Sequence, residues 1–334
     1  MNREIIKARS GINKSIRNFF TEKGYLEVET PLLSPSLIPE STIEVFETEY
    51  HSLKRKPVSL YLIPSPEVFM KQLIADGIGD IFQLTKSFRN YEQSGKYHNP
   101  EFTMLEWYTM NASAADNIPI TEELFERIIH DRGKAGIFSP KIDPRHLTPP
   151  FRRMSMEELF FEKSGIDLAA NLTLEVFRET ARNKGYRIND ADENWESVFN
   201  RIFLTEVEPF LPSDKPLIIY NYPSGIGCLA KDIPSSPWKD RWELYCSGVE
   251  LANCYTEETD PQKAADLFKK EHRIKKQTSE VTPHYESVLN SIFKKSFPES
   301  SGVALGVDRL IQIFTGTDRL EGVILFPLSD ILAQ

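Results

Sequence analysis

The stretch YHNPEFTMLEWY, residues 97–108, places acidic, basic and aromatic side chains along what the pattern indicates is a β-strand. Side chains two residues apart on a strand point to the same face, so Glu106 and Tyr108 lie together, opposite Leu105 and Trp107. A carboxylate beside a phenol can bind an ammonium group through a charge-assisted hydrogen bond and an aromatic wall. Considered alone, the pair is also explained by a tyrosine–glutamate hydrogen bond on the surface, so the surrounding sequence must decide.

The preceding segment, residues 80–90 (DIFQLTKSFRN), alternates in the same way. Phe82, Leu84 and Phe88 share one face, and Arg89 lies on the other, which the pattern predicts to be solvated. The polar loop 90–96 then leads into the 97–108 stretch. We therefore expect the two segments to form a long antiparallel hairpin.

Helices and strands are predicted on both sides of this hairpin. Towards the N-terminus, the pattern predicts a helix that ends near Gly24, a strand over 25–34 stopped by Pro31, a strand over 58–63, and a helix over 65–77 capped by Ser65 with Pro66 at its first position. Towards the C-terminus it predicts strands over 216–223 and within 240–260, helices over 262–277 and 284–296, and a strand then a helix over 300–316. Residues 113–210 are helical segments separated by prolines. We expect an α+β fold, an antiparallel sheet flanked by helices, in a single domain (1–334) with a helical insertion over 113–210.

Composition limits the function classes. The 334 residues contain no run of 18 apolar residues and begin with charges at helical spacing, so we expect a cytoplasmic protein without a membrane partner. The net charge of −9 argues against a surface that binds nucleic acid. Three cysteines, with no close pair, predict buried thiols rather than disulfides or structural zinc.

Two acidic residues, Glu243 and Glu250, flank the turn formers Ser247 and Gly248. In a hairpin with a two- or four-residue loop, residues of opposite sequence parity share a face, so both carboxylates point the same way. Converging carboxylates need a cation or proton between them, and Mg²⁺ prefers such oxygen ligands together with phosphates. The alternative is a pair of solvated acids on an exposed sheet face.

A second candidate site lies in ALGVDRL, residues 304–310. Gly306 ends a strand, and Arg309 lies in the first turn of the following helix. The guanidinium and the helix N-terminus could together hold an anion such as a phosphate. The alternative is that Asp308 caps the helix while Arg309 is solvated.

The order of these segments closely resembles the catalytic domain of class II aminoacyl-tRNA synthetases, in the lysyl branch. TPLLS is similar to motif 1, FRNYEQSGKYHNPEFTMLEWY to motif 2 and SGVALGVDRL to motif 3, while SPEVFMKQL and GVELANCYTEETD carry the lysyl signature. Lysyl-tRNA synthetases have an N-terminal anticodon-binding domain, for which we expect no counterpart here. A stand-alone domain of this kind resembles the elongation factor P (R)-β-lysine ligase family, whose members use ATP to attach (R)-β-lysine to a lysine of elongation factor P.

The resemblance implies ATP and Mg²⁺ as cofactors, elongation factor P rather than tRNA as acceptor, and a homodimer formed through motif 1. It implies that Arg89 and Arg309 are catalytic and bind the α- and γ-phosphates, that Phe102 stacks on adenine, and that Glu243 and Glu250 bind Mg²⁺. The implied ATP-binding residues are Arg89, Asn90, Tyr91, Glu92, His98, Asn99, Phe102, Glu250, Leu251, Gly306 and Arg309. The implied amino-acid-binding residues are Ser65, Pro66, Glu67, Glu106, Tyr108, Asn253, Glu257 and Ala304. Ala304, where the synthetases have glycine, implies a preference for β-lysine over α-lysine.

The sequence departs from the family pattern at two places. Tyr91 occupies the glutamate position of motif 2, and Glu92 follows one residue later; since the loop to His98 is also one residue longer, we expect a bulge that returns Glu92 to the site. Cys254 replaces a glycine. Glu250 and Glu257 have opposite parity, so an irregularity between them is needed to bring both to one pocket.

Two other functions are compatible with the sequence. One is a truncated synthetase paralogue that charges another amine or RNA. The other is a non-catalytic paralogue that binds nucleotide or amino acid. Both phosphate arginines and both metal carboxylates together favour an active enzyme over a binding relic.

Overall fold

The computed structural model describes residues 2–92, 95–135, 143–188, 194–294 and 296–333. Eight strands form the main sheet, in the order β1-β5-β6-β11-β10-β9-β8-β7. Only the two outermost pairs, β1 with β5 and β7 with β8, are parallel. The strands are β1 (Leu26–Glu27), β5 (Ile81–Phe88), β6 (Glu101–Met110), β7 (Arg152–Ser155), β8 (Leu217–Pro223), β9 (Trp238–Cys246), β10 (Val249–Thr256) and β11 (Ser300–Gly306). The predicted α+β class with an antiparallel sheet is confirmed.

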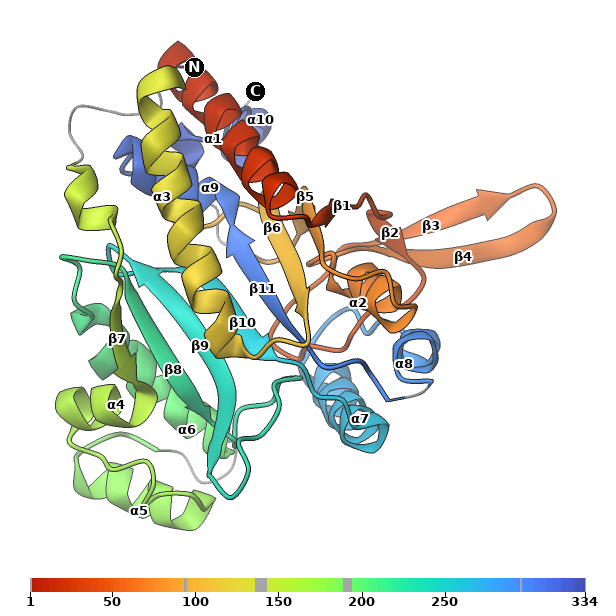
Figure 1. Cartoon of the computed structure of the whole chain (residues 1–334). Coiled ribbons are helices and arrows are strands. Elements are labelled where there is room, and N and C mark those ends of the chain that lie inside the picture. The colour runs from red at the N-terminus through yellow and green to blue at the C-terminus, as the bar shows by residue number, and fades with distance from the viewer. Residues whose placement is uncertain (1, 93–94, 136–142, 189–193, 295, 334) are drawn as a thin grey trace.

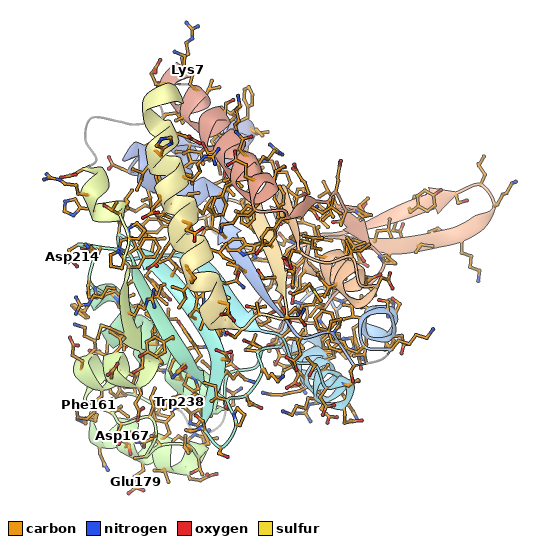
Figure 2. The ribbon with its side chains drawn as sticks, in the orientation of Figure 1. Lys7, Phe161, Asp167, Glu179, Asp214 and Trp238 are labelled. Atoms are coloured by element: carbon orange, nitrogen blue, oxygen red, sulfur yellow. The ribbon has the colours of Figure 1, made fainter. Side chains whose placement is uncertain are left out.

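One face of this sheet is apolar and packs against helices. Helices α1 (Arg3–Glu22), α3 (Asn117–Ala135) and α9 (Val307–Thr315) cover it (Figure 1). Leu105 and Trp107 of β6 point into this core, as do Val303 and Leu305 of β11. Side chains fill the space between sheet and helices (Figure 2). Because side chains alternate along a strand, Glu106 and Tyr108 must then point to the opposite face.

A second, three-stranded sheet lies beside the main one. It consists of β2 (Leu33–Ser34), β4 (Arg55–Leu62) and β3 (Glu47–Ser52), and the hairpin of β3 and β4 projects away from the body of the molecule (Figure 1). Helices α2 (Glu67–Ala75), α7 (Pro261–Thr278) and α8 (Glu286–Ile292) lie near its base, where they share an apolar core.

The described residues of 114–210 lie next to the sheet, and from Met156 onward they form a further apolar core with β8 and β9. They contain short 3₁₀ turns (Ala114–Asp116, Pro144–Leu147 and Glu208–Phe210), helices α4 (Met156–Ser164), α5 (Leu174–Asn183) and α6 (Trp195–Ile202), and a π-helical turn (Phe203–Val207) that continues α6. The chain ends with a 3₁₀ turn (Leu320–Gly322) and α10 (Leu328–Leu332). No helix in the described ranges is both long and apolar enough to cross a bilayer.

Several predicted elements differ in the structure. The strand expected over 25–34 is two short strands in different sheets, since Pro31 has no N–H to continue a ladder. Strand β3 and the four-residue strand β7 were not predicted, because they are too short or too polar to show a clear alternation. Helix α8 is shorter than the predicted 284–296 helix. Helix α2 has Pro66, not Ser65, in the N-cap position, although the Ser65 hydroxyl still accepts a hydrogen bond from the Glu67 N–H at 3.4 Å.

Candidate active site

The β9–β10 hairpin brings the two predicted metal carboxylates to one face. Ser247 and Gly248 form a two-residue turn with φ of 54° and 76°, the conformation that a tight hairpin with right-handed twist requires. Glu250 pairs with Tyr245, which is two residues from Glu243 and therefore on the same face. The parity expected from the sequence is confirmed.

A β-bulge in β10 brings Glu250 and Glu257, which have opposite sequence parity, to the same face of the sheet. The register shifts between Glu250 and Ala252, after which Asn253 pairs with Glu243. Glu250 therefore shares its face with Asn253 and Tyr255, and Glu257, two residues further, lies on that side as well. The irregularity that the sequence required is present, but it lies before Cys254 rather than at it. Cys254 is buried in the apolar core on the other face.

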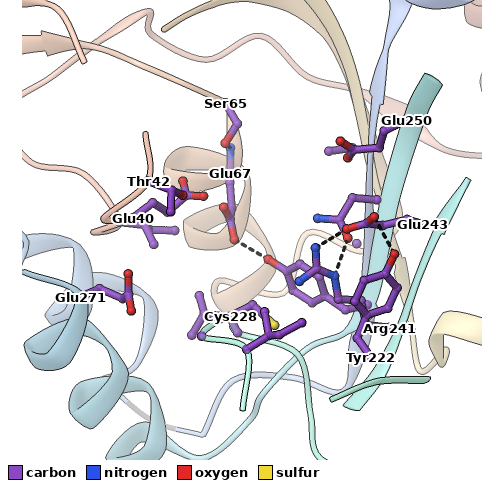
Figure 3. A pocket seen from close by; sticks show the side chains of 18 of the residues that line it. Glu40, Thr42, Ser65, Glu67, Tyr222, Cys228, Arg241, Glu243, Glu250 and Glu271 are labelled. Carbon is purple, nitrogen blue, oxygen red and sulfur yellow. Dashed lines mark hydrogen bonds and ion pairs between the residues drawn. The ribbon is translucent and has the colours of Figure 1, made fainter. Parts of the chain in front are cut away.

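The pocket face of the sheet borders two adjoining cavities, of about 560 Å³ and 230 Å³. Figure 3 shows side chains that line the larger one. The larger cavity is lined by the predicted amino-acid-binding residues Ser65, Glu67, Glu106, Tyr108, Asn253, Glu257 and Ala304 and by Glu243 and Glu250. The smaller is lined by the predicted nucleotide-binding residues Glu92, His98, Asn99, Phe102, Leu251, Gly306 and Arg309. Arg89, Met104, Glu250, Asn253 and Ala304 line both, so the cavities meet there.

Not every predicted residue is in the cavity walls that the structure describes. Pro66, Asn90 and Tyr91 line neither cavity. Tyr91 is exposed and has a positive φ of 58°, and after this kink Glu92 returns to the smaller cavity. Gln93 and Ser94 of the expected bulge lie outside the described residues. The Asn99 side-chain amide donates to the Glu101 carbonyl at 2.6 Å and accepts from the Leu328 N–H at 3.2 Å, so both its polar atoms are used within the protein.

One expectation about β5 is wrong. The face carrying Gln83 and Ser87 was predicted to be solvated, yet both side chains are buried, and Gln83 Oε1 accepts a hydrogen bond from the Thr30 hydroxyl at 3.0 Å. Glu106 pairs with Gln83 across the hairpin and is likewise almost completely buried. The polar pattern marks a buried polar site, which the alternation alone does not distinguish from a solvated face.

The distal end of the larger cavity holds carboxylate oxygens without partners. Tyr108 donates to Glu106 Oε1 at 2.9 Å, but Glu106 Oε2 and Glu257 Oε1 are buried and have no hydrogen-bond partner among the described residues. Burial raises the pKa of both carboxyls, that of Glu257 to about 7. Two unsatisfied buried acceptors beside a phenol are chemically suited to an ammonium group.

Sequence reasoning missed Lys71, which pairs with two of the carboxylates that line this cavity. Its fully buried Nζ lies 2.6 Å from Glu67 Oε1 and 2.7 Å from Glu257 Oε2, while Tyr255 donates to Glu67 at 2.8 Å. Burial alone would lower the Lys71 pKa, but the carboxylates of Glu257 and Glu67 raise it above its ordinary value. The available signal was the spacing of Glu67 and Lys71, four apart on one helix face.

The proposed metal carboxylates have different surroundings. Glu243 Oε1 accepts from Arg241 Nη2 at 2.5 Å, and its Oε2 accepts from Tyr222 at 2.6 Å and Tyr245 at 3.0 Å. Burial and the neighbouring Glu243 raise the pKa of Glu250. Arg241, Tyr222 and Tyr245 were also missed, although Arg241 and Tyr245 are each two residues from Glu243 on one strand.

The carboxylates of Glu243 and Glu250 fit Mg²⁺ only together with oxygen atoms from a bound ligand. Among the described residues, no group of three or more His, Cys, Asp or Glu side chains is arranged to hold a metal ion. Glu243 and Glu250 nevertheless face one cavity, and Mg²⁺ is commonly bound by one or two carboxylates plus substrate phosphates. The residues are therefore compatible with Mg²⁺ bound together with a nucleotide.

Two arginines, Arg89 and Arg309, line the smaller cavity. Arg309 is fixed by bonds from Nη1 to the Glu250 carbonyl at 2.8 Å and from Nη2 to His98 Nε2 at 3.0 Å. Burial and the positive charge of Arg309 lower the pKa of His98. A lower pKa favours the neutral imidazole, which can accept the hydrogen bond from Arg309 Nη2. The Arg89 guanidinium lies 5.3 Å from the Phe102 ring centre, and its buried Nε has no partner among the described residues.

Asp308 does not cap α9. It is buried, forms a 2.5 Å ion pair with Arg9 of α1 and accepts from the Thr103 N–H of β6 at 2.6 Å. Gly306 occupies the N-cap position instead. Asp308 thus fixes α9 against α1 and the sheet, while Arg309 reaches the cavity.

The buried Glu257 carboxyl predicts a pH dependence of stability. Its pKa rises from 4.5 to about 7 on folding, so between these values the folded protein holds a proton that the unfolded chain releases. The free energy of unfolding should therefore fall as pH rises from 5 to 8, by up to about 3 kcal/mol from this group. Urea unfolding of wild type and Glu257→Gln across this range isolates the contribution. Parallel pH profiles in the two proteins would contradict it.

Comparison with known proteins agrees with this geometry. Residues 1–330 match the family model described as tRNA synthetases class II (D, K and N), so the chain belongs to the class II tRNA synthetase family. It is 34% identical over 325 residues to proteins named elongation factor P–(R)-β-lysine ligase from Yersinia pestis (strain Pestoides F) and Yersinia pseudotuberculosis serotype O:1b (strain IP 31758). The match covers 96% of this chain and 94% of each relative. Within the class, the chain belongs to the elongation factor P–(R)-β-lysine ligase family.

Proposed function

We propose that this protein activates (R)-β-lysine with ATP and transfers it to a lysine side chain of elongation factor P. The observation that carries the proposal is the junction of the two cavities at Arg89, Glu250, Asn253 and Ala304. An amino acid held in one cavity would present its carboxylate to the α-phosphate of a nucleotide held in the other. The acidic distal end of the larger cavity suits a substrate with a terminal ammonium group.

In the first step, a carboxylate oxygen of the amino acid attacks the α-phosphorus of ATP, and pyrophosphate leaves as the new phosphorus–oxygen bond forms. Arg89 would stabilise the charge that develops on the α-phosphate, and its Nε, which none of the described residues accepts from, is an available donor. Arg309 would hold the γ-phosphate, and Phe102 would stack on adenine. Catalysis would arise from positioning and electrostatics. Mg²⁺, when bound by Glu243 and Glu250, would neutralise phosphate charge.

In the second step, the unprotonated amine of the acceptor lysine attacks the acyl carbon, an amide bond forms and AMP leaves. Glu106, Tyr108 and Glu257 would hold the distal ammonium of the amino acid through both steps, and Ser65, Glu67 and Asn253 would orient its other end. The net charge of −9 favours a protein acceptor over tRNA.

Exchange of radiolabelled pyrophosphate into ATP tests the first step. With Mg²⁺ present, we expect exchange to be strongest with (R)-β-lysine among α-lysine, both β-lysine enantiomers, arginine and ornithine. A mass increase of elongation factor P, absent when its acceptor lysine is replaced by arginine, tests the second step. Exchange with none of these amino acids would favour a non-catalytic paralogue, and aminoacylation of tRNA would favour a truncated synthetase.

Gly302 of β11 provides a test of the distal site. A Cβ at this position would lie 2.6 Å from Tyr108 Cε1 and 2.9 Å from Glu257 Oε1, closer than atoms can approach. Gly302→Ala should displace both side chains and raise the KM for the amino acid far more than the KM for ATP. Steady-state exchange kinetics measure the KM for the amino acid and the KM for ATP.

Gly306→Ala is the contrasting variant. An added Cβ at this position meets protein atoms only at ordinary contact distances, and the residue lines the smaller cavity instead. Equal changes in the two KM values for Gly302→Ala would contradict the prediction.

We also propose a homodimer formed through the motif 1 segment. Leu26, Leu33 and Ile78 are 55%, 41% and 48% exposed around β1 and β2, where a second copy would cover them. Leu33→Glu should then shift the protein to monomers in sedimentation at micromolar concentration. Leu53→Glu at the tip of the β3–β4 hairpin, where Leu53 is fully exposed, is the control. A wild-type monomer would refute the dimer.

A further inference from the structure

The segment between β2 and β3 contributes an acidic residue to the larger cavity that none of the assigned roles uses. Residues 38–42 form part of its wall, and Glu40 is among them. The segment lies outside the three class II motifs, so sequence reasoning gave it no function. Figure 3 shows Glu40 on the same side of the cavity as Ser65 and Glu67.

Helix α7 fixes the backbone at Glu40 and at the residues that follow it. Glu271 Oε2 accepts from the N–H and the hydroxyl of Ser41, at 3.1 and 2.6 Å. One turn further along α7, Lys275 Nζ donates to the Glu40 carbonyl at 3.1 Å and to the Ile43 carbonyl. Glu271 and Lys275 are both buried. This clamp preorganises residues 40–43, which is typical of a segment that must hold a ligand group accurately.

The Glu40 carboxylate faces charges rather than hydrogen-bond donors. Burial raises its pKa, and Glu67 raises it further, whereas Arg89, Lys275 and Lys71 oppose the shift. None of the described residues donates a hydrogen bond to this carboxylate. Two carboxylates, Glu40 and Glu67, thus lie within electrostatic range of each other and of Arg89. Such a pair is relieved by a cation placed between them.

We propose that Glu40 and Glu67 together bind the amino group at the carboxyl end of the substrate, so that Glu40 determines selection of a diamino acid. The inference rests on the proposed function and specifies which protein group reads the second amino group. Arg89 lines the larger cavity together with both carboxylates and also lines the smaller one, so it lies where the substrate carboxylate would meet the α-phosphate. The ammonium that Glu40 binds is therefore the one near the reacting carboxylate, and the distal ammonium remains with Glu106 and Glu257.

The test compares two ligands that differ by this one amino group. In the wild type, (R)-β-lysine supports exchange, and 6-aminohexanoate, which is the same molecule without the 3-amino group, competes with it. Glu40→Gln should raise the KM for (R)-β-lysine roughly 10- to 100-fold, the range for one charged hydrogen bond. The Ki of 6-aminohexanoate should change less than about 2-fold, since it has no amino group at this position.

Two further variants separate binding from structure. Glu40→Asp keeps the charge on a shorter side chain and should give an intermediate KM. Glu47→Gln removes an acidic charge from the exposed strand β3 and should leave both constants unchanged. Equal weakening of both ligands by Glu40→Gln would show that Glu40 only supports the cavity wall and would overturn the inference. No exchange in the wild type with (R)-β-lysine would instead refute the proposed function.

Discussion

Arg309→Ala should abolish adenylate formation while leaving the fold intact. The guanidinium is held by the Glu250 carbonyl and His98 at the edge of the smaller cavity, where it would meet the γ-phosphate. Loss of one such preorganised donor typically costs about 10²–10³ in rate, and here the positive charge is lost as well. Pyrophosphate exchange at saturating ATP measures the effect.

Arg319→Ala is the matched control for this variant. Arg319 follows α9 on the surface, where it pairs with Glu321, and it lines neither cavity. Its replacement should leave exchange unchanged. Circular dichroism should show that both variants are folded. Wild-type exchange in Arg309→Ala would remove the proposed phosphate role.

Lys71→Met should lower the free energy of unfolding by about 3–5 kcal/mol, because it leaves the buried carboxylates of Glu67 and Glu257 without their shared cation. Methionine fills a similar volume, so packing changes little. Urea unfolding at pH 7 measures the loss. The amino-acid KM should also rise, since two of the carboxylates that line the larger cavity pair with Lys71.

A second substitution separates charge from packing at Lys71. In Lys71→Met/Glu257→Gln, one of the two unpaired charges is removed, so the double variant should be more stable than Lys71→Met alone. A surface substitution such as Lys7→Met, in an exposed pair with Glu4, should cost less than about 1 kcal/mol. A loss of similar size in Lys71→Met would contradict the proposed buried network.

The sequence predicted the main sheet well because its strands carry a clear alternation and tight turns. The β5–β6 hairpin, the β9–β10 hairpin and the strand–helix unit at Arg309 were all expected, although β6 begins at Glu101 rather than at Tyr97. The common face of Glu243 and Glu250 followed from a two-residue turn. The resemblance to the ligase family, carried by its motifs, is confirmed by the comparisons.

The parts that could not be predicted depend on contacts between distant segments. Lys71 meets Glu257 only because α2 packs beside β10, and nothing in the local sequence of either shows this. Glu40 lies in the cavity because α7, more than 200 residues later, holds its backbone through Lys275. The polar face of β5 was predicted to be solvated because the alternation of polar and apolar residues does not show which other segments of the chain cover that face. The roles of individual residues towards ATP, Mg²⁺ and amino acid remain predictions.

The bulge in β10 has a consequence for how this kind of enzyme can change. It divides one strand into two segments with opposite parity: Glu250 before it and Asn253 after it line both cavities, whereas Tyr255 and Glu257 line only the larger one, the proposed amino-acid cavity. We therefore expect a substitution at Tyr255 or Glu257 to alter substrate choice without shifting the residues proposed to serve ATP. If the strand ran through Leu251 without the bulge, Asn253, Tyr255 and Glu257 would instead face the apolar core. The bulge thus lets one strand supply side chains to both cavities, and we expect amino-acid preference to diverge by single substitutions while the proposed nucleotide site is retained.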